Sequence, residues 1–244
     1  MRRGWLIVLA KAPQPGRVKT RMCPPLTAEQ AAELSRSLLA DALEESVRAG
    51  AALGLETVLA VEPPRERPEL AVRAPPDVRV IAQCGPDLAA RMTHAVRQAS
   101  AAGARCALLR GSDSPALDRE VLRVAAAALA FADVVLCPDR DGGYNLVALG
   151  PRALARPGVF DHPMSTPTVL RDTVASAARL GLCAHTLPPG FDLDRFEDLR
   201  WLARARAGAR ERGTSLPCRR TLAFLDERGL WPPEGGSAGL PAGG

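Results

Sequence analysis

The sequence has almost no lysine. Of its 32 basic residues, 30 are arginine and only two, Lys11 and Lys19, are lysine. The two lysines lie close together near the start of the chain. A lysine carries a compact point charge and an arginine a planar fork, so the two are not interchangeable in a binding site. The confinement of lysine to one short segment is a first indication of a functional site.

Long apolar runs and paired cysteines are also missing. The apolar runs, at residues 5–10, 57–61 and 132–137, are far shorter than the roughly 20 residues of a membrane-spanning helix, so no membrane association is expected. Lys11 and two prolines follow the first run, so a buried strand explains it better than a secretion signal. The six cysteines form no C-x-x-C pair and have no histidine at ligand spacing. We therefore expect neither a zinc site nor a disulfide framework, and a cytoplasmic location.

Aromatic residues are scarce as well. They make up only 4% of the chain, which leaves few stacking platforms for single-stranded nucleic acid. The net charge of +5 owes much to an arginine-rich run at residues 200–220. A solvated helix face is the favoured interpretation of that run, and contact with a phosphate backbone is the alternative. A nucleic-acid partner is thus not expected, and the sequence does not predict the oligomeric state.

What the sequence does contain is a repeating βα pattern. Short apolar runs alternate with longer Ala/Leu-rich stretches of helical period, which predicts an α/β fold of three αβα layers with a mostly parallel sheet. Strands are expected at residues 5–10, 55–61, 78–82, 105–109, 133–137, 145–149 and 183–187, and helices at 27–49, 87–101, 118–131, 166–180, 194–210 and 216–230. The Pro/Glu/Arg-rich residues 62–76 are expected to form a surface loop. At 244 residues the chain is long enough for its own core, and we expect one domain over residues 1–231 and a disordered tail over 232–244.

Three unusual segments follow expected strands, where ligands bind in open α/β sheets. The first, residues 11–21, holds four cations, one glycine and no carboxylate. Backbone N–H groups around Gly16 together with clustered cations suit phosphate oxygens, although the segment is neither a Walker A loop nor a G-x-G-x-x-G motif. A basic solvated loop is the alternative.

The second segment contains Asp113, within the sequence GSDSP at residues 111–115. A carboxylate at the end of a strand is suited to Mg²⁺ or Mn²⁺, which take oxygen ligands and bridge phosphates. Helix capping by Asp113 or Ser114 is the alternative.

The third segment, DRDGGY at residues 139–144, follows another strand. Its two glycines allow a ligand close to the backbone, and Asp141 and Tyr144 are suited to bonding a polar substrate; an ordinary tight turn is the alternative. Further along, Asp192 and Asp194 would point to one side of an extended segment, and Asp194 could equally cap a helix. The three histidines are interpreted as structural.

Taken in order, these segments carry a family resemblance. KAPQPGRVKTR, QCGPDLAARM, GSDSP, DRDGGYNLVAL, the ST of HPMSTPTVL and FDLDRFEDL, spread over about residues 5–205, resemble the rSAM/selenodomain-associated transferase 1 family. Members of that family are similar to nucleotide-diphospho-sugar transferases of the GT-A fold and are usually called glycosyltransferases. The stretch VKTRMCPPLTAEQAAEL also resembles the K-S-R-L-x-P-x-L segment of 2-phospholactate guanylyltransferases, nucleotidyltransferases of the same fold.

The resemblance implies roles for individual residues. Lys19, Arg21, Asp113 and Asp141 would be catalytic. The nucleotide would be bound by Ala10, Lys11, Ala12, Gly16, Lys19, Arg21, Gln83 and Gly85. The acceptor would meet Asp141, Gly142, Gly143, Tyr144, Ser165 and Thr166. Asp113 and Asp194 would hold Mg²⁺ or Mn²⁺; Arg195 and Phe196 replace the family's usual Thr-Pro after Asp194, and Asn145 replaces an expected aromatic residue.

Three functions remain open from the sequence. The first is transfer of a sugar from a nucleotide-diphospho-sugar to a small acceptor, with Asp113 holding the metal and Asp141 acting on the acceptor. The second is nucleotidyl transfer, in which an acceptor phosphate attacks the α-phosphate of a nucleoside triphosphate and Lys19 and Arg21 stabilise the developing charge. The third is a non-enzymatic nucleotide- or RNA-binding role. No motif in the sequence identifies the base, the sugar or the acceptor.

Overall fold

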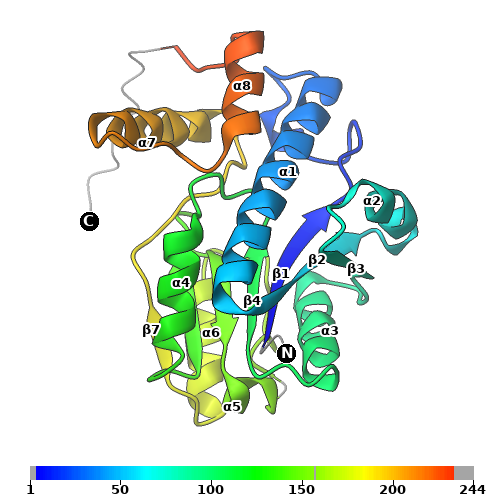
Figure 1. Cartoon of the computed structure of the whole chain (residues 1–244), viewed down its shortest axis with the longest axis vertical. Coiled ribbons are helices and arrows are strands. Elements are labelled where there is room, and N and C mark those ends of the chain that lie inside the picture. Colours follow the sequence, from blue (N-terminus) through cyan, green and yellow to red (C-terminus); the bar gives the residue numbers. More distant parts are fainter. Residues whose placement is uncertain (1–3, 157, 234–244) are drawn as a thin grey trace.

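A mixed sheet of seven strands, in the order β3-β2-β1-β4-β6-β5-β7, forms the centre of the molecule (Figure 1). The structure is a computed structural model that describes residues 4–156 and 158–233. The strands are β1 (Gly4–Lys11), β2 (Leu55–Glu62), β3 (Val78–Ala82), β4 (Ala107–Gly111), β5 (Val134–Pro138), β6 (Tyr144–Leu149) and β7 (Ala184–Thr186).

Helices cover both faces of this sheet. They are α1 (Ala28–Leu53), α2 (Arg67–Arg73), α3 (Leu88–Ala101), α4 (Arg119–Ala128), α5 (Pro151–Leu154), α6 (Val169–Arg179), α7 (Leu199–Glu211) and α8 (Arg219–Arg228). Ile7 and Leu109 face an apolar cluster completed by α3, α5 and α6, whereas Leu6 and Leu108 face a second cluster completed by α4 and the end of α1. This three-layer αβα arrangement with a mostly parallel sheet confirms the expected fold class.

The strand β6 is the exception to the parallel pattern. It runs antiparallel to both β4 and β5, while β1 pairs in parallel with β2 and β4, β2 with β3, and β5 with β7. The loop at residues 139–143 between β5 and β6 is too short for a crossover, so these strands must form a hairpin. The hairpin brings this loop to the same edge of the sheet at which β1 and β4 end.

Helix starts follow local capping chemistry. The capping box expected before α1 is present: Thr27 Oγ1 accepts a bond from Gln30 N at 3.2 Å, and Gln30 Oε1 accepts one from Thr27 N at 2.9 Å. The side chains of Asp87 and Asp118 cap α3 and α4, accepting single bonds of 2.8 and 3.0 Å from the backbone N of Ala90 and Val121. The cap of α4 is thus Asp118, which removes capping as the explanation for Asp113.

Other boundaries were predicted incorrectly. The expected loop at 62–76 contains a 3-10 turn (Pro64–Glu66) and α2, because its prolines stand in the first turn of each helix, where no N–H is needed. The helix expected from residue 166 begins at Val169, after Thr168. The helix expected from residue 194 begins at Leu199, after a 3-10 turn (Phe196–Asp198). The short α5 was not expected at all. Of the expected tail, residues 234–244 lie outside the described residues.

Three further observations concern the whole fold. The helices α7 and α8 lie at one end of the molecule beside the N-terminal half of α1, where they share an apolar cluster with Leu34, Leu38 and Leu193 (Figure 1). Within the described residues, no helix has both the length and the apolar composition that crossing a bilayer requires. All six cysteines are free.

Candidate functional site

The expected segments meet at the carboxyl edge of the sheet, and the stretch 192–194 connects them. Leu193 N donates to Asp113 O at 3.0 Å, at the end of β4. Leu193 O accepts a bond from Lys19 Nζ at 2.6 Å, in the loop after β1. Asp192 N donates to Asp139 Oδ1 at 3.0 Å, in the β5–β6 loop. Segments far apart in the sequence are therefore joined by three hydrogen bonds around one short extended stretch.

Lys19 lies at the centre of this arrangement. Its Nζ is 2.9 Å from Asp113 Oδ2 and 3.6 Å from Asp194 Oδ1, and its side chain is only 5% exposed. Burial lowers the pKa of this ammonium group, but the charges of Asp113 and Asp194 and the hydrogen bond to Asp113 outweigh burial, so the pKa is raised overall. Lys19 therefore stays protonated and holds the two carboxylates on either side of one positive charge.

The backbone of Lys19 is unusual too. Its φ of 49° and ψ of 32° are left-handed, a conformation that costs an L-residue about 1–2 kcal/mol. Val18 before it and Met22 after it are buried, and Met22 N donates to Lys19 O at 2.9 Å. The loop is thus anchored on both sides of Lys19, and the strained position directs a lysine inward. The sequence predicts a functional Lys19 but not this conformation.

Asp194 owes its position to a neighbouring acid. The carboxylate of Asp198 accepts bonds from Asp194 N at 2.9 Å and from Arg195 N at 2.6 Å, so Asp198 holds the turn before α7. The alternative that Asp194 merely caps a helix is wrong, and its carboxylate faces Lys19 instead. The structure therefore brings together Asp113 and Asp194, the two expected metal ligands.

Asp192 and Asp139 belong to the same cluster, and the predicted set of site residues omits both. Asp192 accepts a hydrogen bond from Ser114 Oγ. Burial, followed by the charges of Asp139 and Asp113, raises the pKa of Asp192 to about 8, against the opposing effects of Ser114 and Lys19. Burial likewise raises the pKa of Asp139. The alternation of acids in residues 192–194 was the available signal for Asp192; nothing local distinguished Asp139 from a turn residue.

A buried arginine supports the loop that carries Asp113. Arg110, at the end of β4, is 2% exposed and donates to Ser114 O at 3.1 Å and to Leu117 O at 3.2 Å. Burial lowers the pKa of Arg110 to about 10, while Asp192 and Glu45 act in the opposite direction. An arginine with this pKa is charged at neutral pH. It therefore fixes the carbonyl groups that shape the loop at residues 111–117.

The expected acceptor loop is built around its glycines. Gly142 has a φ of +88°, and a Cβ there would overlap with the carbonyl of Pro167. Leu170 N donates to Gly142 O at 3.0 Å, and Gly143 N donates to Asp141 Oδ1 at 2.8 Å. The loop therefore packs against the segment that holds Ser165 and Thr166, which brings the expected acceptor residues to one place. Asp141 and Ser165 are exposed there and Thr166 is half-buried.

Tyr144 points inward from that loop. Its hydroxyl accepts a bond from Thr173 Oγ1 at 3.5 Å, and Thr173 in turn lies 2.9 Å from His162 Nε2. Burial raises the pKa of the Tyr144 hydroxyl, and the bond from Thr173 opposes that effect. A role of Tyr144 toward an acceptor would thus use its ring rather than its hydroxyl.

The expected nucleotide-binding residues divide into two groups. Lys11, Gly16 and Arg21 are exposed at the rim of the sheet edge. Ala10 and Ala12 are buried, and the amide of Gln83 donates to Ala10 O at 3.2 Å and to Ala60 O at 2.8 Å. Gly85 packs against Ala90 so closely that a Cβ would clash. The first group is exposed to a ligand, whereas Gln83 joins the ends of β1 and β2 and Gly85 allows the chain to pass close to the start of α3.

An arginine–tryptophan stack joins the loop at 139–143 to α7. The guanidinium of Arg140 lies 3.7 Å from the ring centroid of Trp201, and that of Arg204 lies 4.9 Å from it. Cation–π contacts of this kind contribute about 0.5–2 kcal/mol. They tie the loop at 139–143 to a helix outside the sheet, a long-range contact that no local sequence pattern indicates.

The fit of a divalent ion rests on Asp113 and Asp194. Within the described residues, no group of three or more His, Cys, Asp or Glu side chains is arranged to hold a metal. Two carboxylates are nevertheless a donor set that Mg²⁺ uses, since it keeps several waters and takes substrate phosphates as further ligands. The side chains of Asp113 and Asp194, 36% and 45% exposed, are open to such ligands.

Comparison with known proteins agrees with the fold. Residues 33–166 match a family described as an uncharacterized protein conserved in bacteria, DUF2064. No curated protein matches the sequence. A crystal structure from Desulfovibrio desulfuricans G20, provisionally assigned as a nucleotide-diphospho-sugar transferase, is 28% identical, covers 94% of this chain and 97% of its own, and superposes with a TM-score of 0.80.

More distant structures share the fold alone. A CMP:2-keto-3-deoxy-manno-octonic acid synthetase complexed with CTP is 12% identical, with 83% of this chain and 98% of the other covered and a TM-score of 0.51. A 4-diphosphocytidyl-2C-methyl-D-erythritol synthase from Anaerococcus prevotii DSM 20548 is 10% identical, with coverages of 81% and 94% and a TM-score of 0.53. The family match spans more than half of the chain, and the protein is a member of the DUF2064 family.

Proposed function

We propose that this protein is a metal-dependent transferase with a nucleotide-activated donor, and that the donor is a nucleotide-diphospho-sugar. The observation that carries the proposal is the convergence of Lys19, Asp113 and Asp194 at the carboxyl edge of the sheet. Ligands of open α/β sheets bind at that edge. The assignment given to the Desulfovibrio structure supports a sugar nucleotide as donor. The order of motifs shared with the rSAM/selenodomain-associated transferase 1 family supports it too.

In this proposal the sheet edge divides into a donor side and an acceptor side. Lys11, Arg21 and the backbone around Gly16 bind the donor's phosphates, and Lys19 fixes the two carboxylates that face them. Asp113 and Asp194 hold Mg²⁺ or Mn²⁺, which when bound neutralises charge on the diphosphate. The loop at 139–143 and the segment with Ser165 and Thr166 receive the acceptor.

The proposed reaction forms one bond and breaks another. An acceptor hydroxyl oxygen bonds to the anomeric carbon of the sugar while the bond from that carbon to the diphosphate oxygen breaks. The nucleoside diphosphate leaves with the bonding electrons, and the hydroxyl proton passes to the exposed Asp141 carboxylate. The positive charges of Lys11 and Arg21 stabilise the charge that develops on the leaving group.

Nucleotidyl transfer is the second candidate, favoured by the charge of the first loop. Residues 11–21 carry four cations and no carboxylate, which suits a triphosphate better than a diphosphate. In this reaction an acceptor phosphate oxygen bonds to the α-phosphorus and the bond to the pyrophosphate oxygen breaks. Lys19 and Arg21 would then stabilise charge on the α-phosphate and on pyrophosphate.

Phosphorus NMR distinguishes the two reactions. The protein is incubated with Mg²⁺ or Mn²⁺, panels of nucleoside triphosphates and nucleotide sugars, and a crude small-molecule extract as the acceptor source. Release of nucleoside diphosphate from a nucleotide sugar is the expected result. Release of pyrophosphate from a nucleoside triphosphate would replace the first candidate by the second. If metal-dependent nucleotide binding is absent as well as turnover, both candidates are wrong.

A further inference from the structure

A cavity of about 740 Å³ lies between α1 and α2, beside the loop that follows β1. Most of its lining is apolar, and the residues that matter here are Leu39, Leu43 and Val47 of α1, Leu59 of β2 and Leu70 of α2. Protein interiors rarely contain voids much larger than a water molecule, and pockets of 300–1,000 Å³ are typical of small-molecule sites. The cavity opens to solvent, and its volume lies within the range of small-molecule sites.

The cavity exists because α2 covers the sheet without packing into it. Leu39, Leu43 and Leu59 are buried and form part of an apolar cluster on this face. None of the seven residues of α2 is buried, and Val72 is 87% exposed. A helix that turns only Leu70 toward such a cluster, followed by Ala74 just beyond its end, leaves apolar surface without a partner.

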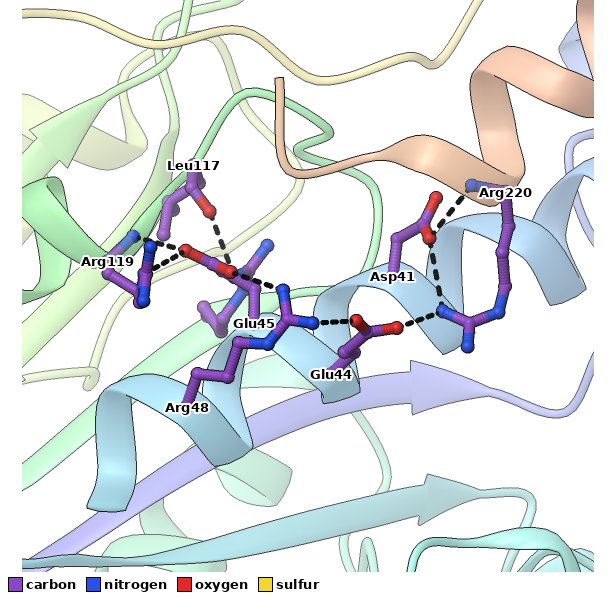
Figure 2. A network of polar contacts seen from close by, with 8 residues as sticks. Asp41, Glu44, Glu45, Arg48, Leu117, Arg119 and Arg220 are labelled. Carbon is purple, nitrogen blue, oxygen red and sulfur yellow. Dashed lines mark hydrogen bonds and ion pairs between the residues drawn. The ribbon is translucent and has the colours of Figure 1, made fainter. Parts of the chain in front are cut away.

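The rim of the cavity carries more positive than negative charge. Its charged residues are Arg36, Glu44, Arg48, Glu66, Glu69, Arg73 and Arg220. Figure 2 shows that Glu44 is shared between Arg48 and Arg220, and Glu69 pairs with Arg73 at 3.0 Å. Within the described residues Arg36, on the exposed side of α1, has no carboxylate partner. An arginine at the mouth of an apolar cavity is suited to an anionic head group.

We propose that this cavity binds a small amphipathic anion, with its apolar chain on Leu39, Leu43, Val47 and Leu59 and its acidic head at Arg36. Among the described residues, the cavity lining has no aromatic side chain on which a nucleobase could stack. It reaches Ala12, Pro13 and Gln14, in the loop that follows Lys11, so it adjoins the proposed donor side, but its lining includes neither Lys19 nor Asp113. The inference goes beyond the proposed function and does not rest on it.

Calorimetric titration with dodecyl phosphate tests the proposal. We expect saturable binding of one molecule per chain, weaker binding of dodecanol, and no binding of dodecyltrimethylammonium. Filling the cavity by Ala40→Phe, a lining residue of α1, should weaken dodecyl phosphate binding at least tenfold. Arg36→Gln should weaken the binding of dodecyl phosphate about tenfold, which corresponds to the loss of one charge-assisted hydrogen bond, and should leave the binding of dodecanol unchanged.

The matched control is Arg97→Gln, an exposed arginine of α3 on the other face of the sheet, which should bind dodecyl phosphate like the wild type. Equal binding of the cationic amphiphile, or wild-type affinity in both Ala40→Phe and Arg36→Gln, would overturn the proposal. So would the absence of saturable binding by the wild type. Sedimentation with phosphatidylglycerol vesicles tests whether the ligand is a soluble molecule or a lipid surface. We expect that the protein does not sediment with the vesicles. Co-sedimentation that is lost in Arg36→Gln would mean that Arg36 and the cavity contact a lipid surface instead.

Discussion

Lys19 combines a left-handed backbone, a buried ammonium group and two carboxylate partners. The first costs conformational strain and the second costs desolvation, and the ion pairs with the carboxylates offset these costs only if their geometry is good. The neighbouring Arg17, by contrast, is exposed. The chain uses arginine almost everywhere else, and a guanidinium fork would not fit between Asp113, Asp194 and the carbonyl of Leu193 without displacing them.

We therefore predict that Lys19→Arg is the more damaging of two conservative changes. The larger side chain at this buried position should cost about 1–3 kcal/mol in the free energy of unfolding, as overpacking does. Displacement of Asp113 should lower turnover roughly 100-fold. Arg17→Lys should change both by little. Urea unfolding and the phosphorus NMR assay measure these effects, and equal tolerance of the two substitutions would contradict the role given to Lys19.

Burial also makes the cysteines differ in reactivity. Burial raises the pKa of Cys137 to about 11 and that of Cys218 to about 12. A raised pKa leaves less thiolate, roughly one thiol in a thousand at pH 8 for a pKa of 11, and only the thiolate reacts. We predict that iodoacetamide at pH 8 labels the exposed Cys84 and Cys183 in the native protein and spares Cys137 and Cys218. Mass spectrometry after brief labelling identifies the sites; labelling of Cys218 as fast as Cys84 would show that α8 does not shield it.

At the scale of elements, α1 is the common support of α4 and α8. Glu45 accepts a bond from Arg119 N at 2.8 Å, at the start of α4 (Figure 2). Asp41 accepts bonds from Arg220 N at 3.1 Å and from Thr221 N and Oγ1 at 2.8 Å each, at the start of α8. One face of α1 thus caps two other helices, and this links the loop of Asp113 to the end of the molecule formed by α7 and α8.

We predict that Asp41→Ala destabilises the protein by about 3 kcal/mol, because it removes several bonds from a buried carboxylate. Glu44→Ala, one turn along the same helix, should cost about 0–1 kcal/mol, since its ion pairs with Arg48 and Arg220 are at the surface. Urea unfolding of the two variants gives the comparison. Similar losses for both would mean that the hydrogen bonds that Asp41 accepts do not hold α8.

The conformation of the loop at 139–143 depends on a glycine. We predict that Gly142→Ala costs clearly more stability than Gly54→Ala, although both have positive φ. At Gly54 a Cβ meets nothing within 4 Å, so only the left-handed strain of about 1–2 kcal/mol applies; at Gly142 the Cβ would also overlap with Pro167. Turnover should fall in Gly142→Ala alone, because the loop must move away from Ser165 and Thr166. Equal losses of stability and full turnover in both variants would contradict a contact between this loop and the acceptor.

At the scale of the whole molecule, the sequence is informative where structure is local. Apolar runs locate the strands, Thr27 with Gln30 and Asp118 mark helix starts, and the order of motifs places the loops at strand ends. What the sequence does not predict depends on contacts between distant segments. The bond from Ser114 to Asp192 and the stack of Arg140 on Trp201 form only once the sheet is assembled.

Prolines mislead for a related reason. Pro64 and Pro68 suggest a loop, yet each stands in the first turn of a helix, where its fixed φ is favourable. The cavity beneath α2 was consequently invisible in the sequence. Asp139 was missed as a site residue because its neighbours give it the pattern of an ordinary turn.

Nucleotide binding by the wild type and by Asp113→Asn tests the proposed metal and donor site. Calorimetry with a panel of nucleoside diphosphates and sugar nucleotides, with and without Mg²⁺, is the measurement. Asp118→Asn serves as the control, since asparagine also caps α4. We predict Mg²⁺-dependent binding by the wild type and Asp118→Asn, and loss of the Mg²⁺ dependence in a folded Asp113→Asn. Unchanged Mg²⁺-dependent binding in Asp113→Asn would contradict the assignment of the sheet edge as the donor site.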